Sequence, residues 1–582
     1  MFNRIKYLFI LLAVALSASC EELRFGDDFL EMPAGNEDNL DVVFSSAENA
    51  EQALVTAYAT LPDMMITKLS YDFLESLTDL NNGSMGWGPM RSTYYPGQLN
   101  SSTAEGNLHY RYSTGGWPGI RAAWVFIENV DRVPDMTDIN KEIRKAEAKV
   151  IIAIHYLDMF RCFGGVPWID HSYKPGEDMS HLPRMTVEET VSRIVTLLDE
   201  AAAVLPWSVD AANDGRMTKA AALGLKVRTL LFAASPIFND DVPYLDGEAA
   251  AAHLVWYGNK SMERWDAVVT ACEEFLRELE LNGWYAMVDT GNPREDFRKA
   301  YFERYNGEVL VSTRRRTKYP GLWSEKNSFM ETPLYGTGNT TLDYVDMFPM
   351  KDGTDFDWDN PEHAAHPFFD ASGAEVRDPR LYETTNVNGD AWQGRTVESW
   401  IGGRERPNEV YEKQLFASGF AIRKFRQDVN SSAGQFYSWP YLRLPEIFLS
   451  YAEALNEVGR TSEAYEYLNR TRKRVGVTPV ASGLSTDEFR EAVLRERALE
   501  FGYEEVRFYD LVRWKRDDLF RKKLHGLNIR SADKGVTLTY ERFEIPMSRA
   551  WQGDGWNPKW YFLPLPIAEV NKKYGLIQNP GW

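Results

Sequence analysis

The chain has 582 residues and a formal net charge of −20 at pH 7, with 85 acidic against 65 basic residues. Nucleic acids and anionic lipid surfaces are poor partners for so acidic a chain, because binding to either requires basic patches. A hydrophobic content of 44% is enough for a large buried core, and the length fits two to four domains or one large repeat-built body.

The first twenty residues have the organisation of a secretory leader. Two basic residues precede an unbroken apolar run at residues 7–16, and small residues then lead to Cys20. Ten apolar residues span about 15 Å as a helix, whereas the hydrocarbon core of a bilayer needs about 30 Å. We therefore predict a signal peptide over residues 1–19 and a lipid anchor such as palmitate on Cys20. Plain secretion with an incidental Cys20 is the alternative.

Helical patterns dominate from the leader to about residue 310. In residues 186–206, apolar residues recur at helical spacing, Thr186 and Glu189 form a capping-box pair, and Pro206 follows the end. Another predicted helix ends at Gly164. These apolar stripes are wide, which is typical of helices that pack on both sides.

Several bulky or reactive residues within the helical segments are predicted to lie in the core. Cys162 and Cys272 have the surroundings of buried thiols, and a disulfide between them is the alternative. The same prediction covers four tryptophans, namely Trp117, Trp124, Trp265 and Trp514.

The pattern changes between residues 311 and 442, where helical periodicity fades and Gly, Pro, Asn, Trp and Tyr become frequent. This composition predicts long loops with a few short strands. Helical periodicity resumes at Arg443, and two helices separated by Gly459 end at Gly476, which gives a unit of 34 residues. That is the tetratricopeptide length, and such hairpins stack because none can bury its apolar face alone. We predict a mostly α fold, a tetratricopeptide-like helical-hairpin scaffold with one large loop-rich insertion.

The last helices carry charges at helical spacing. Arg497–Glu500 and Asp510–Arg513 are i,i+3 pairs of opposite sign, and Arg495 and Glu496 are neighbours on the same helix. A carboxylate- or sugar-binding cluster is one interpretation. The interpretation we favour is a buried ion-pair network that joins the last helices. The Arg377-Asp378-Pro379-Arg380 segment is predicted to cap a turn.

A series of motifs occurs in a consistent order from Cys20 to Trp582. The series includes DFLEMP, FGGVPWI, VRDPRLY, LPEIFLSYAEALNEVG, LRERALEFGYEEVRFYDLVRWKR and YFLPLPIAEVNKKYGLIQNPGW. In this order and over the whole chain, the motifs resemble the SusD/RagB family of surface nutrient-binding lipoproteins.

The resemblance implies a tetratricopeptide-like fold, a non-catalytic glycan-binding activity and a surface-exposed position on the cell outer membrane, anchored through lipid at Cys20. It also implies a partner, a SusC-like TonB-dependent transporter that the lipoprotein covers like a hinged lid. Glu21-Glu22 resemble the acidic surface-export signal of such lipoproteins. We therefore divide the chain into a signal peptide (1–19), a tether (20–42), an N-terminal helical half (43–310), a loop-rich ligand-binding region (311–442) and a C-terminal helical half (443–582).

Two loop segments combine the groups that a sugar needs. Flat aromatic faces bury the C–H face of a sugar ring, while Asn, Asp and Arg satisfy its hydroxyls. Glycines around the aromatics allow tight, exposed loops. The first segment contributes Asn81, Asn82, Trp87, Arg91, Tyr94 and Tyr95, and the second contributes Arg316, Tyr319, Trp323, Asn327 and Tyr335. Family members have ligand-contacting aromatics in about these two parts of the chain.

Metal and catalytic motifs are weak. The acidic residues from Asp352 to Asp359 resemble a calcium loop, but Asn360 and His366 stand where an EF-hand needs Gly and Glu. His363 and His366 have no further ligand beside them, so we predict no metal and no cofactor, with a structural calcium ion as a minor alternative. No catalytic motif is present either, although the many acidic residues leave a pair for glycoside cleavage open.

Three functions compete. The leading hypothesis is a receptor that captures an oligosaccharide and delivers it to the transporter. The second keeps the fold but binds peptide, as in the RagB branch, since a loop groove also suits a peptide backbone. A surface glycoside hydrolase is the third. The sequence does not identify the glycan, nor does it indicate the affinity without the transporter.

Overall fold

The computed structural model describes residues 37–62, 74–83, 90–102, 115–174, 176–316, 338–392, 394–407, 418–425, 436–546 and 548–582. These residues form a mostly helical body with five small two-stranded antiparallel sheets, which confirms the predicted mostly α class. None of the described helices is long and apolar enough to cross a membrane.

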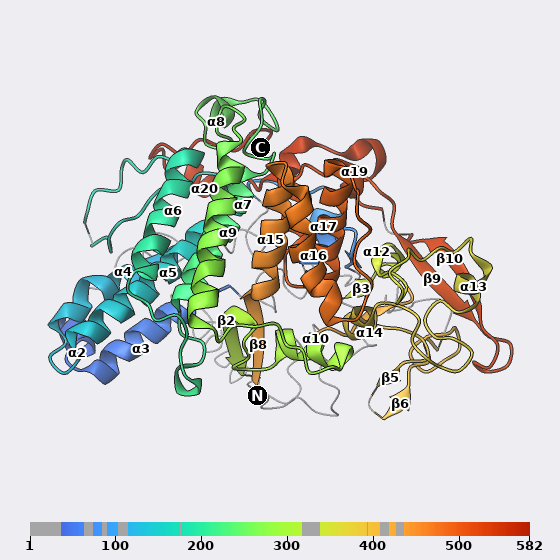
Figure 1. The fold of residues 1–582 in the computed structure, drawn as a ribbon. Coiled ribbons are helices and arrows are strands. Elements are labelled where there is room, and N and C mark those ends of the chain that lie inside the picture. The colour runs from blue at the N-terminus through green and yellow to red at the C-terminus, as the bar shows by residue number, and fades with distance from the viewer. Residues whose placement is uncertain are drawn as a thin grey trace, which may run out of the picture.

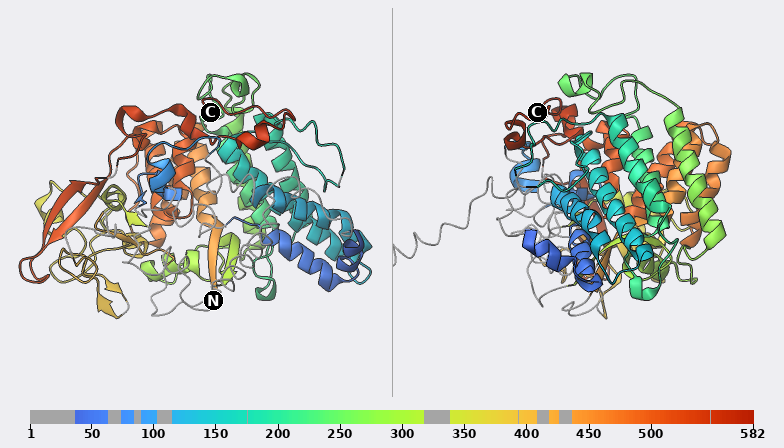
Figure 2. Two further views of the ribbon diagram at one scale, coloured as in Figure 1. Left: turned by 180° about the vertical axis from the view of Figure 1, so that it is seen from behind. Right: turned by 90° about the vertical axis from the view of Figure 1, so that its left-hand side faces the viewer.

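The long helices stand side by side in one row (Figure 1), and the row is also visible from behind (Figure 2). Each helix packs on the next one along the chain from α3 to α7, then α7 packs on α9 and α9 on α15. The row ends with α16 and α17, which pack on α15. Its members are α3 (Ala47–Tyr58), α4 (Trp117–Asn129), α5 (Asp138–Phe163), α6 (Val187–Ala202), α7 (Lys219–Ala234), α9 (Glu263–Asn282), α15 (Leu444–Glu457), α16 (Thr461–Arg474) and α17 (Thr486–Phe501).

Helix ends in this row follow the predicted local chemistry. At the start of α6 the Thr186 hydroxyl accepts a bond from the Glu189 N–H at 3.2 Å, and the Glu189 carboxylate accepts one from the Thr186 N–H at 2.9 Å. Helix α5 ends at Gly164, whose φ of 77° is open to glycine at little cost. The α15–α16 hairpin is separated at Gly459 and ends at Gly476, with φ of 80° and 70°.

The core predictions hold at these sites. Cys162 and Cys272 are buried and no disulfide joins them, so the alternative of a disulfide is wrong. Trp265 is buried, and the other three predicted core tryptophans are partly buried against the main core.

The loop-rich region is closed at its base by the longest sheet. Strand β2 (Val309–Arg316) pairs with β8 (Phe436–Arg443), so that Val309 lies opposite Arg443 and Arg316 opposite Phe436. Short elements lie between them, on the right of Figure 1: β3 (Asn339–Thr340), α12 (Leu342–Met347), α13 (Pro361–Ala365), α14 (Pro379–Thr384), β4 (Thr385–Asn386), β5 (Ala391–Trp392), β6 (Arg395–Thr396) and β7 (Ala421–Ile422). They share a second hydrophobic core around Tyr344, Leu381 and Trp439.

Shorter elements complete the chain. A C-terminal hairpin of β9 and β10 packs beside α12, and α10 packs against β8 and α14. The bounds are α2 (Glu37–Val43), α8 (Glu248–Ala251), α10 (Pro293–Phe302), α18 (Arg507–Arg513), α19 (Asp517–Phe520), β9 (His525–Arg530), β10 (Thr539–Glu544) and α20 (Ile567–Val570).

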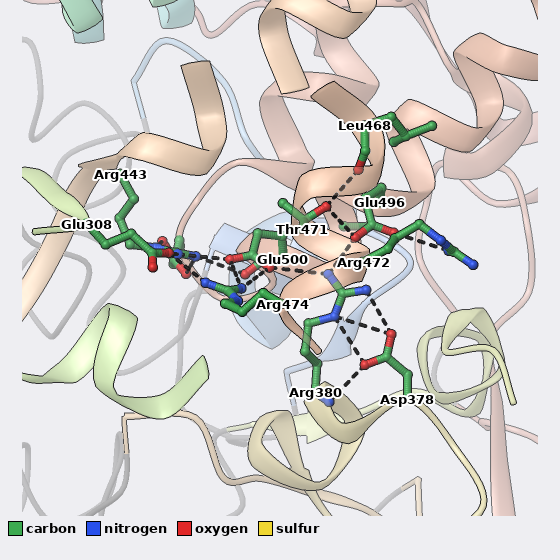
Figure 3. Close-up of polar contacts among 12 residues, drawn as sticks. Glu308, Asp378, Arg380, Arg443, Leu468, Thr471, Arg472, Arg474, Glu496 and Glu500 are labelled. Atoms are coloured by element: carbon green, nitrogen blue, oxygen red, sulfur yellow. Dashed lines mark hydrogen bonds and ion pairs between the residues drawn. The ribbon is translucent and has the colours of Figure 1, made fainter. Parts of the chain in front are cut away.

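A buried ion-pair network joins the insertion to the helical row (Figure 3). The Glu500 carboxylate on α17 accepts bonds from Arg443 at 2.9 Å, from Arg474 at 2.6 Å and from Arg380 at 3.2 Å. Glu308, just before β2, accepts from Arg443 at 2.8 Å and from Arg474 at 2.7 Å. All five side chains are at most 1% exposed. The network therefore holds one strand pair, one insertion helix and two helices of the row in a single arrangement.

The network that we favoured from sequence is thus present, but some of its partners differ. Arg497 pairs with Asp510 at 2.8 Å instead of with Glu500, because three guanidinium groups from other elements already surround Glu500. Arg513 pairs with Asp510 at 2.8 Å as predicted. Arg495 pairs with Asp355 in the insertion.

The predicted turn cap is also present. The Asp378 carboxylate accepts from the Arg380 N–H at 2.9 Å at the start of α14, and Arg380 reaches Glu496 at 2.6 Å. The cap therefore links the insertion to α17.

Substituting Glu500→Gln is expected to lower the free energy of unfolding by about 3–5 kcal/mol, because three guanidinium groups lose a buried counter-charge. Chemical denaturation measures the change. Glu463→Gln serves as the control, since Glu463 forms an exposed i,i+3 pair with Arg460 and its loss should leave the midpoint unchanged. Equal midpoints for Glu500→Gln and wild type would contradict a structural role for the network.

Candidate functional site

The two aromatic segments that the sequence selected meet at a short strand pair. Strand β1 (Asn81–Asn82) begins the first segment and β3 follows the second. The strands are antiparallel, with Asn81 opposite Thr340 and Asn82 opposite Asn339. The start of the first segment and the end of the second, more than two hundred residues apart in the chain, therefore lie side by side.

Several of the predicted contact residues lie outside the described residues. These are Trp87 in the first segment, and Tyr319, Trp323, Asn327 and Tyr335 in the second. Cys20 lies outside them as well.

Two arginines hold the backbone at and before β1 in place. The Arg549 guanidinium donates to the Thr78 and Asn81 carbonyls, both at 2.6 Å, and Arg507 pairs with the Asp79 carboxylate at 2.7 Å. On the β3 side, the Thr340 and Tyr503 hydroxyls are 2.7 Å apart. Sequence reasoning missed these supports, because an arginine hundreds of residues away gives no local signal.

Tyr95 fixes the backbone of the first segment through hydrogen bonds. Its hydroxyl donates to the Ser76 carbonyl at 2.9 Å and accepts from the Gly83 N–H at 2.8 Å, while Arg549 lies over its ring at 4.9 Å. Tyr94 and Tyr95 are both buried. Their burial favours a role in holding the loop, and contact with ligand stays a prediction for them.

Arg91 is the predicted contact residue that is both described and accessible. It is partly exposed, on a π-helical turn at Met90–Tyr94. Such turns are rare and frequently occur at functional sites. Asn81, in contrast, is buried, and its side chain donates to the Ser76 hydroxyl at 2.7 Å.

Several buried polar atoms in and beside β1 have no hydrogen-bond partner among the residues that the structure describes. They are the oxygen and the nitrogen of the Asn82 amide, Asn81 Oδ1 and Glu75 Oε2. Buried polar atoms are nearly always hydrogen-bonded, so these atoms call for further polar partners beside them.

The pKa of Glu75, which lies on the turn beside β1, is shifted. Its carboxylate accepts a bond from the Glu505 N–H at 2.7 Å. Burial, reinforced by the nearby Glu505 carboxylate, raises the pKa of Glu75 to about 8. The side chain is therefore largely a neutral acid at neutral pH.

The acidic run of the insertion is engaged internally. The Asp352 carboxylate accepts from the Thr354 N–H at 2.9 Å, and Asp357 donates its N–H to His363 at 3.1 Å. In the part of the chain that the structure describes, no group of three His, Cys, Asp or Glu side chains is placed to hold a metal ion.

Glu75 should make stability depend on pH. It releases its proton near 4.5 when unfolded and near 8 when folded, so the folded state holds the extra proton between these values. Stability should therefore fall as pH rises through this window, by on the order of a few kcal/mol. Melting curves of wild type and Glu75→Gln across the window test this: the variant should gain stability relative to wild type as pH rises, and a constant difference would contradict the assignment.

Two family models match the chain. The SusD family model matches residues 308–582, and a model described as "Starch-binding associating with outer membrane" matches residues 28–231. Together they cover most of the sequence.

Individual proteins agree with the models. SusD-like protein P25 of Formosa agariphila is 23% identical over 88% of this chain and 89% of its own length. SusD-like protein P2 of the same organism is 38% identical over 24% of this chain and 25% of its own length.

Solved structures show the same fold at low identity. A SusD-like protein from Bacteroides fragilis gives a TM-score of 0.73 at 21% identity and covers 94% of this chain and 99% of its own. A laminarin-binding SusD-like protein gives 0.57 at 18% identity, over 93% and 100%. The chain therefore belongs to the SusD/RagB family, whose members are non-catalytic, outer-membrane-associated carbohydrate-binding proteins.

Proposed function

We propose that this chain is a cell-surface receptor that captures an oligosaccharide and delivers it to a SusC-like TonB-dependent transporter in the outer membrane. The observation that carries the proposal is the β1–β3 pairing, which joins the start of the first aromatic segment to the end of the second on a family scaffold. A ligand that touches both segments is then held between residues from distant parts of the chain.

The chemistry of the two segments suits a sugar. In our proposal the rings of Trp87 and Trp323 cover the C–H faces of successive sugar rings, with Tyr319 and Tyr335 beside them. Arg91 and Asn327 bond the hydroxyls at the rim. Tyr95 and Arg549 hold the first segment in place through hydrogen bonds, and they need no contact with the ligand.

The frame fits a binding role. Ligand identity would depend on loops that project from a scaffold fixed by buried ion pairs, so loops can differ while the frame stays constant. The five-part division of the chain, with residues 311–442 as the ligand-binding region, belongs to this proposal.

Calorimetric titration of residues 21–582 against plant, fungal and host glycans tests the proposal, with a peptide mixture as a second arm. We expect saturable binding to one glycan without its breakdown. Trp87→Ala and Trp323→Ala should each weaken that binding by about 30-fold or more, the loss of an aromatic hot spot worth about 2 kcal/mol.

Trp256→Ala is the control, because Trp256 is partly buried near α8 and its indole N–H donates to the Ala250 carbonyl at 2.8 Å. It should leave the affinity unchanged. Unchanged affinity in Trp87→Ala and Trp323→Ala would contradict our choice of loops. Binding of peptides with silence across the glycans would move the protein to the peptide-uptake branch.

The proposed position on the membrane rests on Cys20. Cys20→Ala should release the protein from the outer-membrane fraction into the soluble fraction, because the lipid anchor is lost, while wild type should copurify with a large barrel partner. Immunoblots of fractionated cells measure both. Wild type found only in the soluble fraction would contradict the anchor.

A further inference from the structure

A second aromatic and polar pocket lies away from the β1–β3 site. It is formed where the chain leaves α9, where it leaves α10, and by the start of β2. Trp284 and Tyr305 stand at its edge, and Asp214, Arg314, Thr218 and Tyr285 are among its walls.

The two edge aromatics are exposed and adjacent. Trp284 is 45% exposed and Tyr305 is 37% exposed, and their ring centroids are 4.9 Å apart at an interplanar angle of 40°. Together they form a bent aromatic surface at the mouth of the pocket. The exposed faces of these two rings do not pack in the hydrophobic core.

Both residues also have an unfavourable backbone. Trp284 has a φ of 68° and Tyr305 a φ of 51°, in the left-handed region where Gly or Asn costs less than a bulky aromatic. The segments are fixed against each other, since Ala286 donates its N–H to the Gly307 carbonyl at 2.9 Å. A Cβ on Gly307 would lie 2.9 Å from the Trp284 carbonyl oxygen. Strained backbone positions cluster at active sites and ligand-binding sites.

Three of the four charged side chains in the walls already have partners. The Arg314 guanidinium pairs with the Asp214 carboxylate through both terminal nitrogens. Arg216 pairs with Glu51 at 2.7 Å and with Glu147 at 3.1 Å. The fourth, Glu303, is exposed. Walls whose partly buried charges are already paired favour an uncharged ligand with many hydroxyls over an ion, and flat aromatic faces favour one with a C–H face. A neutral sugar ring has both properties.

We propose that Trp284 and Tyr305 form a second carbohydrate subsite, which binds a neutral sugar ring over the Asp214–Arg314 pair. The inference rests on the proposed function and extends it. Strand β2, which lines this pocket, carries the start of the second predicted binding segment at Arg314. A long glycan therefore gains a second point of attachment on the same protein.

The test uses residues 21–582 labelled with 5-fluorotryptophan, with the resonance of residue 284 assigned through Trp284→Phe. Neutral hexasaccharides of glucan, xylan and mannan are titrated while fluorine NMR follows that resonance and calorimetry follows affinity. We expect one of them to shift the resonance, and Trp284→Ala to weaken its binding by about tenfold or more. Leu281→Ala is the control, because Leu281 is 73% exposed but not part of the pocket wall.

A second variant separates binding from folding. Trp284→Gly removes the ring and relieves the positive φ, so the melting temperature should not fall although binding at the subsite is lost. A resonance that no hexasaccharide shifts would overturn the subsite, even where calorimetry detects binding elsewhere. A resonance that shifts while Trp87→Ala and Trp323→Ala leave affinity unchanged would support the subsite and contradict the site of the proposed function.

Discussion

The carboxylate of Glu500 is the point on which the arrangement of this molecule depends. Three guanidinium groups reach it, from β8, from α16 and from the insertion helix α14. A buried carboxylate that lost these partners would strongly destabilise the folded protein, so the network favours one placement of the insertion relative to the helices. The surrounding arginines hold the pKa of Glu500 well below its usual range despite its burial.

The consequences extend to the binding segments. The Arg443 that meets Glu500 ends β8, and β8 pairs with β2, which leads into the second segment. The first segment is fixed separately by Arg507 and Arg549, whose partners lie directly around β1. Both segments are therefore joined to a frame fixed by buried ion pairs, and in our proposal their side chains determine the ligand. The same frame carries the Trp284 pocket, since Arg314 lies on β2.

How much the sequence predicts depends on the range of the interaction. Local chemistry was readable: the Thr186–Glu189 capping box, the glycines that end α5 and α16, and the Asp378 cap are all where their patterns put them. The choice of ion-pair partners between distant parts of the chain was not readable from the sequence. Arg497 turns to Asp510 because other arginines occupy Glu500, and no helical spacing contains that information.

For the site, composition selected two loops but could not separate contact residues from supports. Tyr95 has the surroundings of an exposed loop aromatic in sequence, yet the Ser76 carbonyl and the Gly83 N–H hold its hydroxyl inside. Trp284 was not selected at all. It follows directly after a helix end, and the sequence does not show the exposure, the positive φ or the neighbouring Tyr305 that distinguish it from a core aromatic.

The most direct test of the account is hydrogen–deuterium exchange of residues 21–582 with and without the glycan that it binds. We expect ligand to slow exchange in residues 74–102 and 317–341 together, while the helices from α3 to α9 and from α15 to α17 keep their rates. Protection in only one of the two segments, or slower exchange spread over the helical row, would contradict a site built from two loops on a rigid frame.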